Sequence, residues 1–190
     1  MLRHLVPVLL VVSSMAQGVQ ARQDTEYLNH FIEVERVSGV SARLLWAMAK
    51  VESSHSPQAM NRGHLARTDS YDIGLMQINS RWLPTLAKFG ITEEKLKEPR
   101  TSIEVGAWIL RDLFRRHGNT WEAVGAYNAA CTQLKGDACR KARDLYIGKV
   151  RNALGKAPDI ERMEQTFGEF VYRTPTDQET ETKISTLTIN

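Results

Sequence analysis

Apolar residues recur at intervals of three and four positions through most of the chain between residues 24 and 150. This spacing is typical of helices that bury one face, because an α-helix turns by about 100° per residue. No stretch alternates apolar and polar residues for long enough to predict a strand. The pattern therefore predicts one all-α domain over residues 22–155, with helices over 25–38, 42–53, 101–117, 121–130 and 138–150.

Residues that favour helix ends border these segments. Gly39 and Gly118 follow the last apolar positions of two segments, where glycine commonly ends a helix. Side chains of Ser, Thr and Asp accept hydrogen bonds from the first backbone N–H groups of a helix. We therefore expect N-caps at Asp24, Ser41, Thr120 and Asp137, and a capping box at Thr101–Glu104.

The segment 54–79 lacks helical periodicity and is rich in Gly, Pro, Ser and Asn. Such a composition predicts a long ordered loop between two helices. Within it, Gly74 permits a tight backbone, and Gln77 and Asn79 offer amide donors and acceptors. The loop is therefore a candidate for one wall of a binding site.

The first 21 residues have the form of a secretory signal peptide. Arg3 precedes an apolar run from Leu5 to Val12, and Val19–Ala21 has the small-x-Ala form of a cleavage site. A membrane anchor needs about 20 consecutive apolar residues, and polar residues from position 13 interrupt this run. We expect an exported protein without a stable membrane anchor; the alternative is an uncleaved amphipathic helix or an anchor.

Export bears on the two cysteines, Cys131 and Cys139, which enclose a short polar loop. An oxidising compartment favours a disulfide between them, and the alternative is two free thiols. After residue 155 the sequence becomes polar, and acidic residues outnumber basic ones. We expect residues 156–190 to form a flexible tail, although the aromatic patch Phe167–Tyr172 could instead dock on a partner.

The overall composition is that of an average globular protein, with 42% hydrophobic and 25% charged residues. This composition excludes collagen-like and wholly disordered chains. The net charge of +3 is too small to argue for a nucleic-acid partner. Two cysteines and five scattered histidines provide no recognisable metal-ligand spacing. We therefore expect neither a metal nor a cofactor.

Glu52 occupies an unusual place in the pattern. On a helical projection it lies about 20° from Leu45 and about 40° from Met48, on the apolar stripe of its helix. Burial raises the pKa of a carboxyl group, and so does the negative end of a helix dipole. A carboxyl that stays protonated near neutral pH can act as a general acid. The alternative is that the helix has already frayed and the Glu52 side chain is solvated.

Three short motifs follow one another with a distinctive spacing. They are Glu52-Ser53, Gly74-Leu75-Met76-Gln77-Ile78-Asn79 and Ala126-Tyr127-Asn128-Ala129. In order and spacing they resemble the motifs of the soluble lytic transglycosylase family, which has a lysozyme-like fold. The short format, with FGI at 89–91 and GAWIL at 106–110, resembles members that accompany conjugation, pilus and secretion machines. The resemblance covers roughly residues 27–152.

The resemblance implies roles for individual residues. Glu52 falls on the single catalytic acid of the family. Tyr127 falls on a tyrosine whose hydroxyl group binds that acid. The other positions implied to lie near the acid or to contact the glycan are Ser70, Met76, Gln77 and Asn128.

The resemblance also implies an activity. Its members cleave peptidoglycan between N-acetylmuramic acid and N-acetylglucosamine, leave a 1,6-anhydro end and need no cofactor. For this chain it implies a periplasmic enzyme that opens the wall for a secretion, conjugation or pilus apparatus, with the tail as a docking region. Two alternatives remain open: a hydrolytic lysozyme that uses Glu52 with Asp72 or Asp69, and a non-catalytic wall-binding assembly factor.

Overall fold

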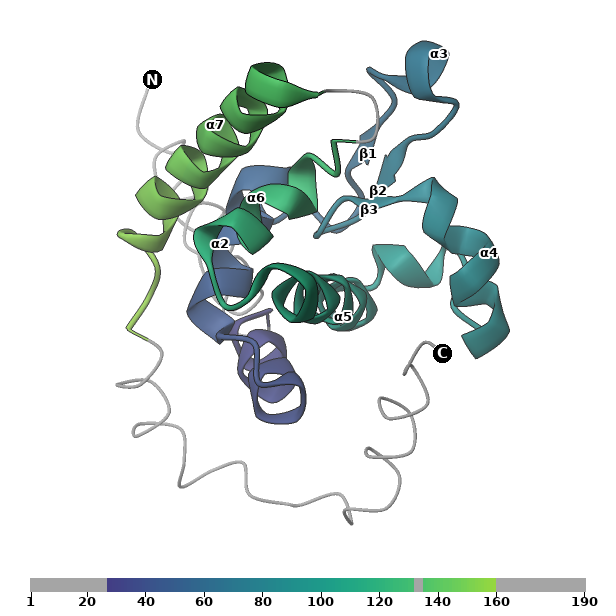
Figure 1. Ribbon diagram of the computed structural model, residues 1–190. Coiled ribbons are helices and arrows are strands. Elements are labelled where there is room, and N and C mark those ends of the chain that lie inside the picture. The colour runs from purple at the N-terminus through teal and green to yellow at the C-terminus, as the bar shows by residue number, and fades with distance from the viewer. Residues whose placement is uncertain (1–26, 132–134, 160–190) are drawn as a thin grey trace, which may run out of the picture.

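The computed structural model describes residues 27–131 and 135–159, and most of these residues are helical (Figure 1). After a first helix over residues 27–38, the α-helices are α2 (Ala42–Ser53), α3 (Leu65–Thr68), α4 (Leu83–Leu86), α5 (Pro99–His117), α6 (Trp121–Asn128) and α7 (Gly136–Leu154). Three short 3-10 helices cover Ser80–Trp82, Ala87–Phe89 and Lys95–Lys97. The prediction of an all-α domain is confirmed. The predicted signal peptide, Asp24 and nearly all of the predicted tail lie outside the described residues.

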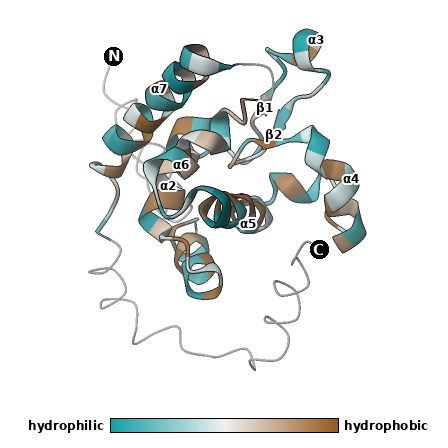
Figure 2. Ribbon diagram, in the orientation of Figure 1, coloured by the Kyte–Doolittle hydropathy of each residue, from teal (hydrophilic) through white to brown (hydrophobic). Residues whose placement is uncertain are grey.

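Helix α5 lies near the middle of the fold, next to α6 and α2 (Figure 1). Helix α6 packs against both α5 and α7, and α7 also packs against α2. Each long helix carries both hydrophobic and hydrophilic residues, as an amphipathic helix requires (Figure 2). Their apolar faces form one core, whose fully buried side chains include Phe31, Leu45, Met48, Leu75, Ile103 and Leu110.

The helix ends agree with the sequence at some places and differ at others. Ser41 and Thr120 cap α2 and α6, each accepting a backbone N–H three residues ahead, and Gly118 ends α5. The capping box at Thr101–Glu104 is wrong, because α5 begins at Pro99, a residue well suited to the first helical turn. The cap at Asp137 is also wrong. Its carboxylate lies in the first turn of α7 and pairs with Arg140 instead.

The loop at 54–79 is ordered, as predicted, but it contains a small antiparallel sheet that the pattern did not predict. Its strands are β1 (Met60–Asn61), β2 (Asp72–Ile73) and β3 (Ile78–Asn79), in the order β1-β2-β3. Each strand has only two residues, too few for an alternating pattern to be visible in the sequence. Side-chain contacts tie this sheet to the helices, since the Ser53 hydroxyl at the end of α2 donates to the Leu75 carbonyl (2.7 Å).

Glycine is required at position 74, between β2 and β3. Its φ is +75°, in the left-handed region. A Cβ atom there would lie 2.1 Å from the backbone oxygen of Leu96, far inside van der Waals contact. The loop therefore reaches the body of the protein through a backbone contact that only glycine permits.

A disulfide joins Cys131 to Cys139, as the sequence predicted. It connects the segment after α6 to the first turn of α7. Arg143 of α7 strengthens this junction by donating to the Ala129 carbonyl and pairing with Glu122. The cross-link thus lies between the two helices that complete the site described below. No helix within the described ranges is long and apolar enough to cross a membrane.

Candidate active site

Glu52 lies in the last turn of α2, which continues to Ser53 and is capped by Ser54 in a left-handed conformation. The alternative of a helix frayed at Glu52 is therefore wrong. Burial removes water from the carboxyl group, and this desolvation raises its pKa from 4.5 to about 7. A carboxyl group with such a pKa is half protonated at neutral pH, so it can both donate and accept a proton.

The hydroxyl that binds Glu52 comes from Tyr146 rather than from Tyr127. Tyr146 is buried on α7 and donates to Oε1 of Glu52 at 2.5 Å. The Tyr127 hydroxyl, on α6, donates to the Met76 carbonyl at 3.0 Å. The bond that the resemblance implied for Tyr127 is thus made by Tyr146, which was not among the predicted site residues. Packing of α7 against α2 brings Tyr146 to Glu52.

Charged and polar neighbours also change the pKa of the Glu52 carboxyl group. After desolvation, the hydrogen bond from Tyr146 lowers its pKa, the charge of Asp72 raises it, and Lys149 lowers it. Burial also raises the pKa of both Tyr127 and Tyr146 well above the ordinary value of tyrosine. Both phenols therefore remain protonated at neutral pH and act as hydrogen-bond donors.

Asp72 approaches the site from β2, where amide side chains hold its carboxylate. Asn79 donates to Oδ1 (2.8 Å) and Asn61 donates to Oδ2 (3.3 Å). Nε2 of His64 lies 3.6 Å from Oδ2. In contrast, Asp69 is exposed at the end of α3. Of the two aspartates considered in the sequence, only Asp72 acts electrostatically on Glu52.

Ser70 and Gln77 support the loop from inside. Ser70 is buried, and its hydroxyl oxygen lies 3.0 Å from that of Thr68 and accepts from Asn79 (3.2 Å). Gln77 adopts a positive φ of 49°. Its Nε2 atom donates to the carbonyls of Gly74 (2.8 Å) and Ala59 (3.2 Å). Both side chains therefore stabilise the shape of the 54–79 loop.

The structure places the Met76 side chain in the core, contrary to the expectation that it lines the glycan groove. It has no exposed surface and packs against Gly106, where an added Cβ would lie 2.9 Å from its Cε atom. The Met76 N–H donates to the buried Ser102 hydroxyl (3.1 Å), and its carbonyl accepts from Tyr127. Asn128, in contrast, is exposed at the end of α6.

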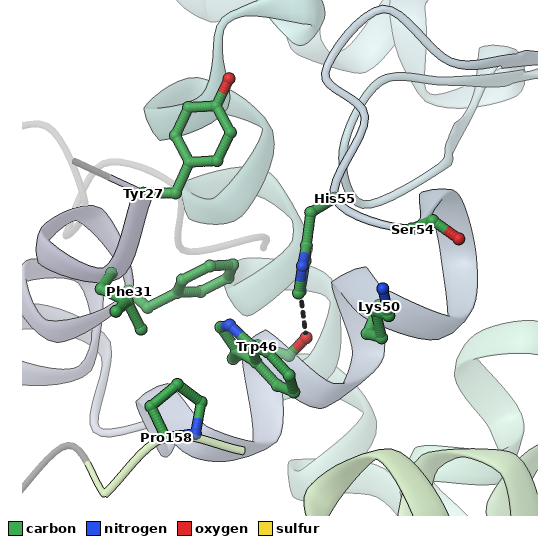
Figure 3. A pocket seen from close by; sticks show the side chains of 8 residues that line it. Tyr27, Phe31, Trp46, Lys50, Ser54, His55 and Pro158 are labelled. Carbon is green, nitrogen blue, oxygen red and sulfur yellow. Dashed lines mark hydrogen bonds between the residues drawn. The ribbon is translucent and has the colours of Figure 1, made fainter. Parts of the chain in front are cut away.

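A separate pocket of about 440 Å³ lies against another face of α2 (Figure 3). Trp46 and Lys50 line it from α2, and His55, whose Nε2 atom is 3.0 Å from the Trp46 carbonyl, lines it from the following turn. Lys50 is two positions before Glu52, about 200° away around the helix. The pocket is lined by Tyr27, Leu28, Phe31, Trp46, Lys50, Ser54, His55 and Pro158, none of which is a predicted site residue.

Across residues 27–131 and 135–159, no group of three or more His, Cys, Asp or Glu side chains is arranged to hold a metal ion. The Glu52 carboxyl group can donate or accept a proton near neutral pH, Tyr146 donates a hydrogen bond to it, and the charge of Asp72 raises its pKa.

Comparison with known proteins finds one matching family and several similar proteins. Residues 29–144 match the family described as Transglycosylase SLT domain. The chain is 41% identical over 128 residues to "Invasion protein IagB" of Salmonella typhimurium, covering 67% of this chain and 76% of that protein. It is 35% identical over 116 residues to "Protein IpgF" of Shigella flexneri, covering 60% and 74%. It is also 40% identical over 108 residues to "X polypeptide" of Escherichia coli, covering 56% and 61%.

Proposed function

The chain belongs to the transglycosylase SLT domain family, and from this membership we propose that it is a lytic transglycosylase with Glu52 as its single proton donor and acceptor. The substrate is peptidoglycan, and the bond cleaved joins N-acetylmuramic acid to N-acetylglucosamine. The observation that carries the proposal is the Glu52 carboxyl group: burial raises its pKa to about 7, and its Oε1 atom accepts a hydrogen bond from the Tyr146 hydroxyl.

In the first step, protonated Glu52 donates its proton to the oxygen of the glycosidic bond. The bond between this oxygen and the anomeric carbon of N-acetylmuramic acid breaks, and the oxygen keeps the electron pair. Positive charge develops at the anomeric carbon, as in other glycosidic cleavages. Glu52 becomes a carboxylate, and the hydrogen bond from Tyr146 stabilises this form.

In the second step, the 6-hydroxyl group of the same sugar attacks the anomeric carbon. A carbon–oxygen bond closes the 1,6-anhydro ring, and the hydroxyl proton passes to the Glu52 carboxylate. The acid is thereby regenerated, and no water is consumed. One carboxyl group serves both steps because a pKa near 7 allows it to exist in either form at neutral pH.

Other residues shape the groove in this proposal. Asn128 is exposed and available to contact the glycan. Ser70 and Gln77 hold the loop that forms one wall. Tyr127 contributes by fixing the Met76 carbonyl. We assign to Met76 a contribution through its backbone, since its side chain is in the core.

Hydrolysis is the second candidate function. Of the two aspartates that could serve as its second carboxylate, the structure favours Asp72 over Asp69. In a hydrolase, Asp72 would activate water or attack the anomeric carbon, with Glu52 as the acid. The products distinguish the two reactions. Transglycosylation leaves an anhydro end, and hydrolysis leaves a reducing end that is heavier by one water molecule.

The test is a digest of purified peptidoglycan with the wild-type protein and with Glu52→Gln, followed by mass spectrometry. We expect anhydro products from the wild type and none from the variant, because glutamine can accept the Tyr146 hydrogen bond but cannot donate the proton. Full activity of Glu52→Gln would refute the mechanism. Reducing-end products from the wild type would establish hydrolysis instead.

In the cell, we propose that the enzyme opens the wall locally for a secretion, conjugation or pilus apparatus. The relative named as an invasion protein in Salmonella typhimurium supports this role. Periplasmic location and docking through residues 156–190 are part of the same proposal. If Glu52→Gln retained the cellular function, the protein would instead be the non-catalytic assembly factor.

A further inference from the structure

The pocket beside α2 (Figure 3) lies on the side of that helix away from Glu52. Most of its surface is apolar or aromatic. Leu28 and Phe31 are buried, whereas the rings of Tyr27 and Trp46 are partly exposed. Its volume of about 440 Å³ falls within the usual range of ligand sites. The pocket is therefore large enough and apolar enough to hold the side chains of a peptide.

The charge of the pocket narrows the choice of occupant. Lys50 is exposed in the last turn of α2, and none of the eight lining residues is acidic. Binding surfaces with complementary charge select their partners and suppress wrong ones. The pocket thus favours an occupant that combines aromatic side chains with negative charge.

The described residues end beside this pocket. Helix α7 stops at Leu154, Pro158 lines the pocket, and Asp159 is the last described residue (Figure 3). The chain that follows therefore starts at the pocket itself. Phe167 comes eight positions after Asp159, and eight residues can span up to about 28 Å. The sequence around Phe167 can accordingly turn back and reach the lining rings.

One segment of the following sequence has the composition that the pocket favours. Residues 164–172 read Glu-Gln-Thr-Phe-Gly-Glu-Phe-Val-Tyr, with three aromatic residues, two glutamates and no basic residue. The chain that leads into Tyr27 is a poorer match, because residues 22–26 read Arg-Gln-Asp-Thr-Glu and offer no apolar side chain. The segment 164–172 is therefore the part of the neighbouring sequence that best complements the pocket.

We propose that residues 164–172 dock in this pocket within the same molecule. Aromatic side chains of the segment contact the lining rings and leave water, and a glutamate carboxylate faces Lys50. A short tether gives a docking segment an effective concentration in the millimolar range, so even a weak contact stays formed. The docked segment covers the side of α2 away from Glu52. A partner that binds residues 164–172 therefore has to compete with the pocket for them.

The first experiment maps the contact by photo-cross-linking in a dilute solution of the full chain. Benzoylphenylalanine replaces Phe170, and in the matched control it replaces Leu187, an apolar residue further along the tail. Mass spectrometry then identifies the joined peptides. From position 170 we expect cross-links within one molecule to peptides that contain residues 27–31 or 46–55, and from position 187 we expect none. Cross-links from position 170 only to other surfaces, or only between two copies, would overturn the inference.

The second experiment measures the binding of a labelled synthetic peptide of residues 160–175 by fluorescence anisotropy. In the full chain carrying Phe167→Ser and Phe170→Ser together, the pocket is free. We expect the peptide to bind this variant at least about tenfold more tightly than the wild type, whose own segment competes. Adding Lys50→Glu to the variant should weaken binding. Adding Lys88→Glu should not, since Lys88 is exposed outside the pocket.

A charge exchange separates loss of the ion pair from damage to the fold. A peptide with Glu164→Lys and Glu169→Lys should bind the Lys50→Glu protein more tightly than the natural peptide does, and a misfolded pocket would bind neither. Equal affinity of the natural peptide for the wild type and the double serine variant would overturn docking within the molecule. Affinity that does not respond to the charge at position 50 would overturn the choice of this pocket.

Discussion

Replacing Tyr146 with phenylalanine removes a single hydroxyl group from the site and leaves the ring in the core. That hydroxyl donates to Oε1 of Glu52 at 2.5 Å, and the bond lowers the pKa of Glu52 against the opposing effect of burial. The ionised form therefore loses its hydrogen-bond donor in the variant, whereas the protonated form loses little. We expect the pKa of Glu52 to rise above its value of about 7.

The size of the effect follows from the strength of the bond. A hydrogen bond to a charged group contributes about 1.5–3 kcal/mol, and a change of one in pKa corresponds to about 1.4 kcal/mol. The alkaline limit of activity in Tyr146→Phe should therefore move up by roughly one to two pH units. At the same time kcat should fall, because Glu52 must be ionised, and stabilised in that form, when it accepts the proton of the 6-hydroxyl group.

The assay is the release of anhydro sugars from purified peptidoglycan between pH 5 and 9 (about two pH units either side of neutrality). Tyr127→Phe is the matched control, since its hydroxyl donates to the Met76 carbonyl rather than to Glu52. Its alkaline limit should stay near that of the wild type. An unchanged limit in Tyr146→Phe, or a shift to lower pH, would show that the Tyr146 hydroxyl does not act on the ionised acid.

Three further predictions concern stability and are measured by chemical or thermal unfolding. The pKa of Glu52 is higher in the folded than in the unfolded protein, so this group favours the folded state below pH 4.5, and its contribution to stability is lost as the pH rises to about 7. Glu52→Gln should therefore be more stable than the wild type at pH 8, by up to about 3 kcal/mol. An equal difference in stability at pH 4 would contradict this prediction. Gly74→Ala should destabilise the protein by about 2 kcal/mol or more, because the new Cβ meets the Leu96 carbonyl at a positive φ, and wild-type stability would refute the requirement for glycine. Reducing the Cys131–Cys139 disulfide should lower stability by about 2.5 kcal/mol, and a double serine variant with an unchanged melting temperature would show that the cross-link is dispensable.

Local sequence was a good guide wherever the determining contacts are local. Ser41 and Thr120 cap helices because their hydroxyl groups reach N–H groups three residues away. The apolar stripe correctly placed Glu52 on the buried side of α2. The local rule failed at Thr101–Glu104, where Pro99 starts the helix two residues earlier and Ser102 is drawn into a hydrogen bond with a distant backbone N–H.

Predictions about the site were weaker wherever the partner is distant in sequence. Tyr146 is 94 positions from Glu52, and only the packing of α7 on α2 brings them together. Nothing in the spacing of a single helix distinguishes a tyrosine that binds a buried carboxyl group from one that fills the core. Met76 illustrates the reverse error, because its motif implied a groove position and the close approach of Gly106 gives its side chain a place in the core.

The chain by itself determined the helical class, several helix ends, the pairing of Cys131 with Cys139 and the place of Glu52 on the buried side of its helix, because these depend on periodicity, capping and short separations. Only the tertiary structure decided which hydroxyl group binds Glu52 and that Asn61, Asp72 and Asn79 form one row. The physical reason is that strands of two residues leave no periodic trace, and that the pKa of a carboxyl group depends on every element that excludes water from it. Those elements meet only when the chain has folded.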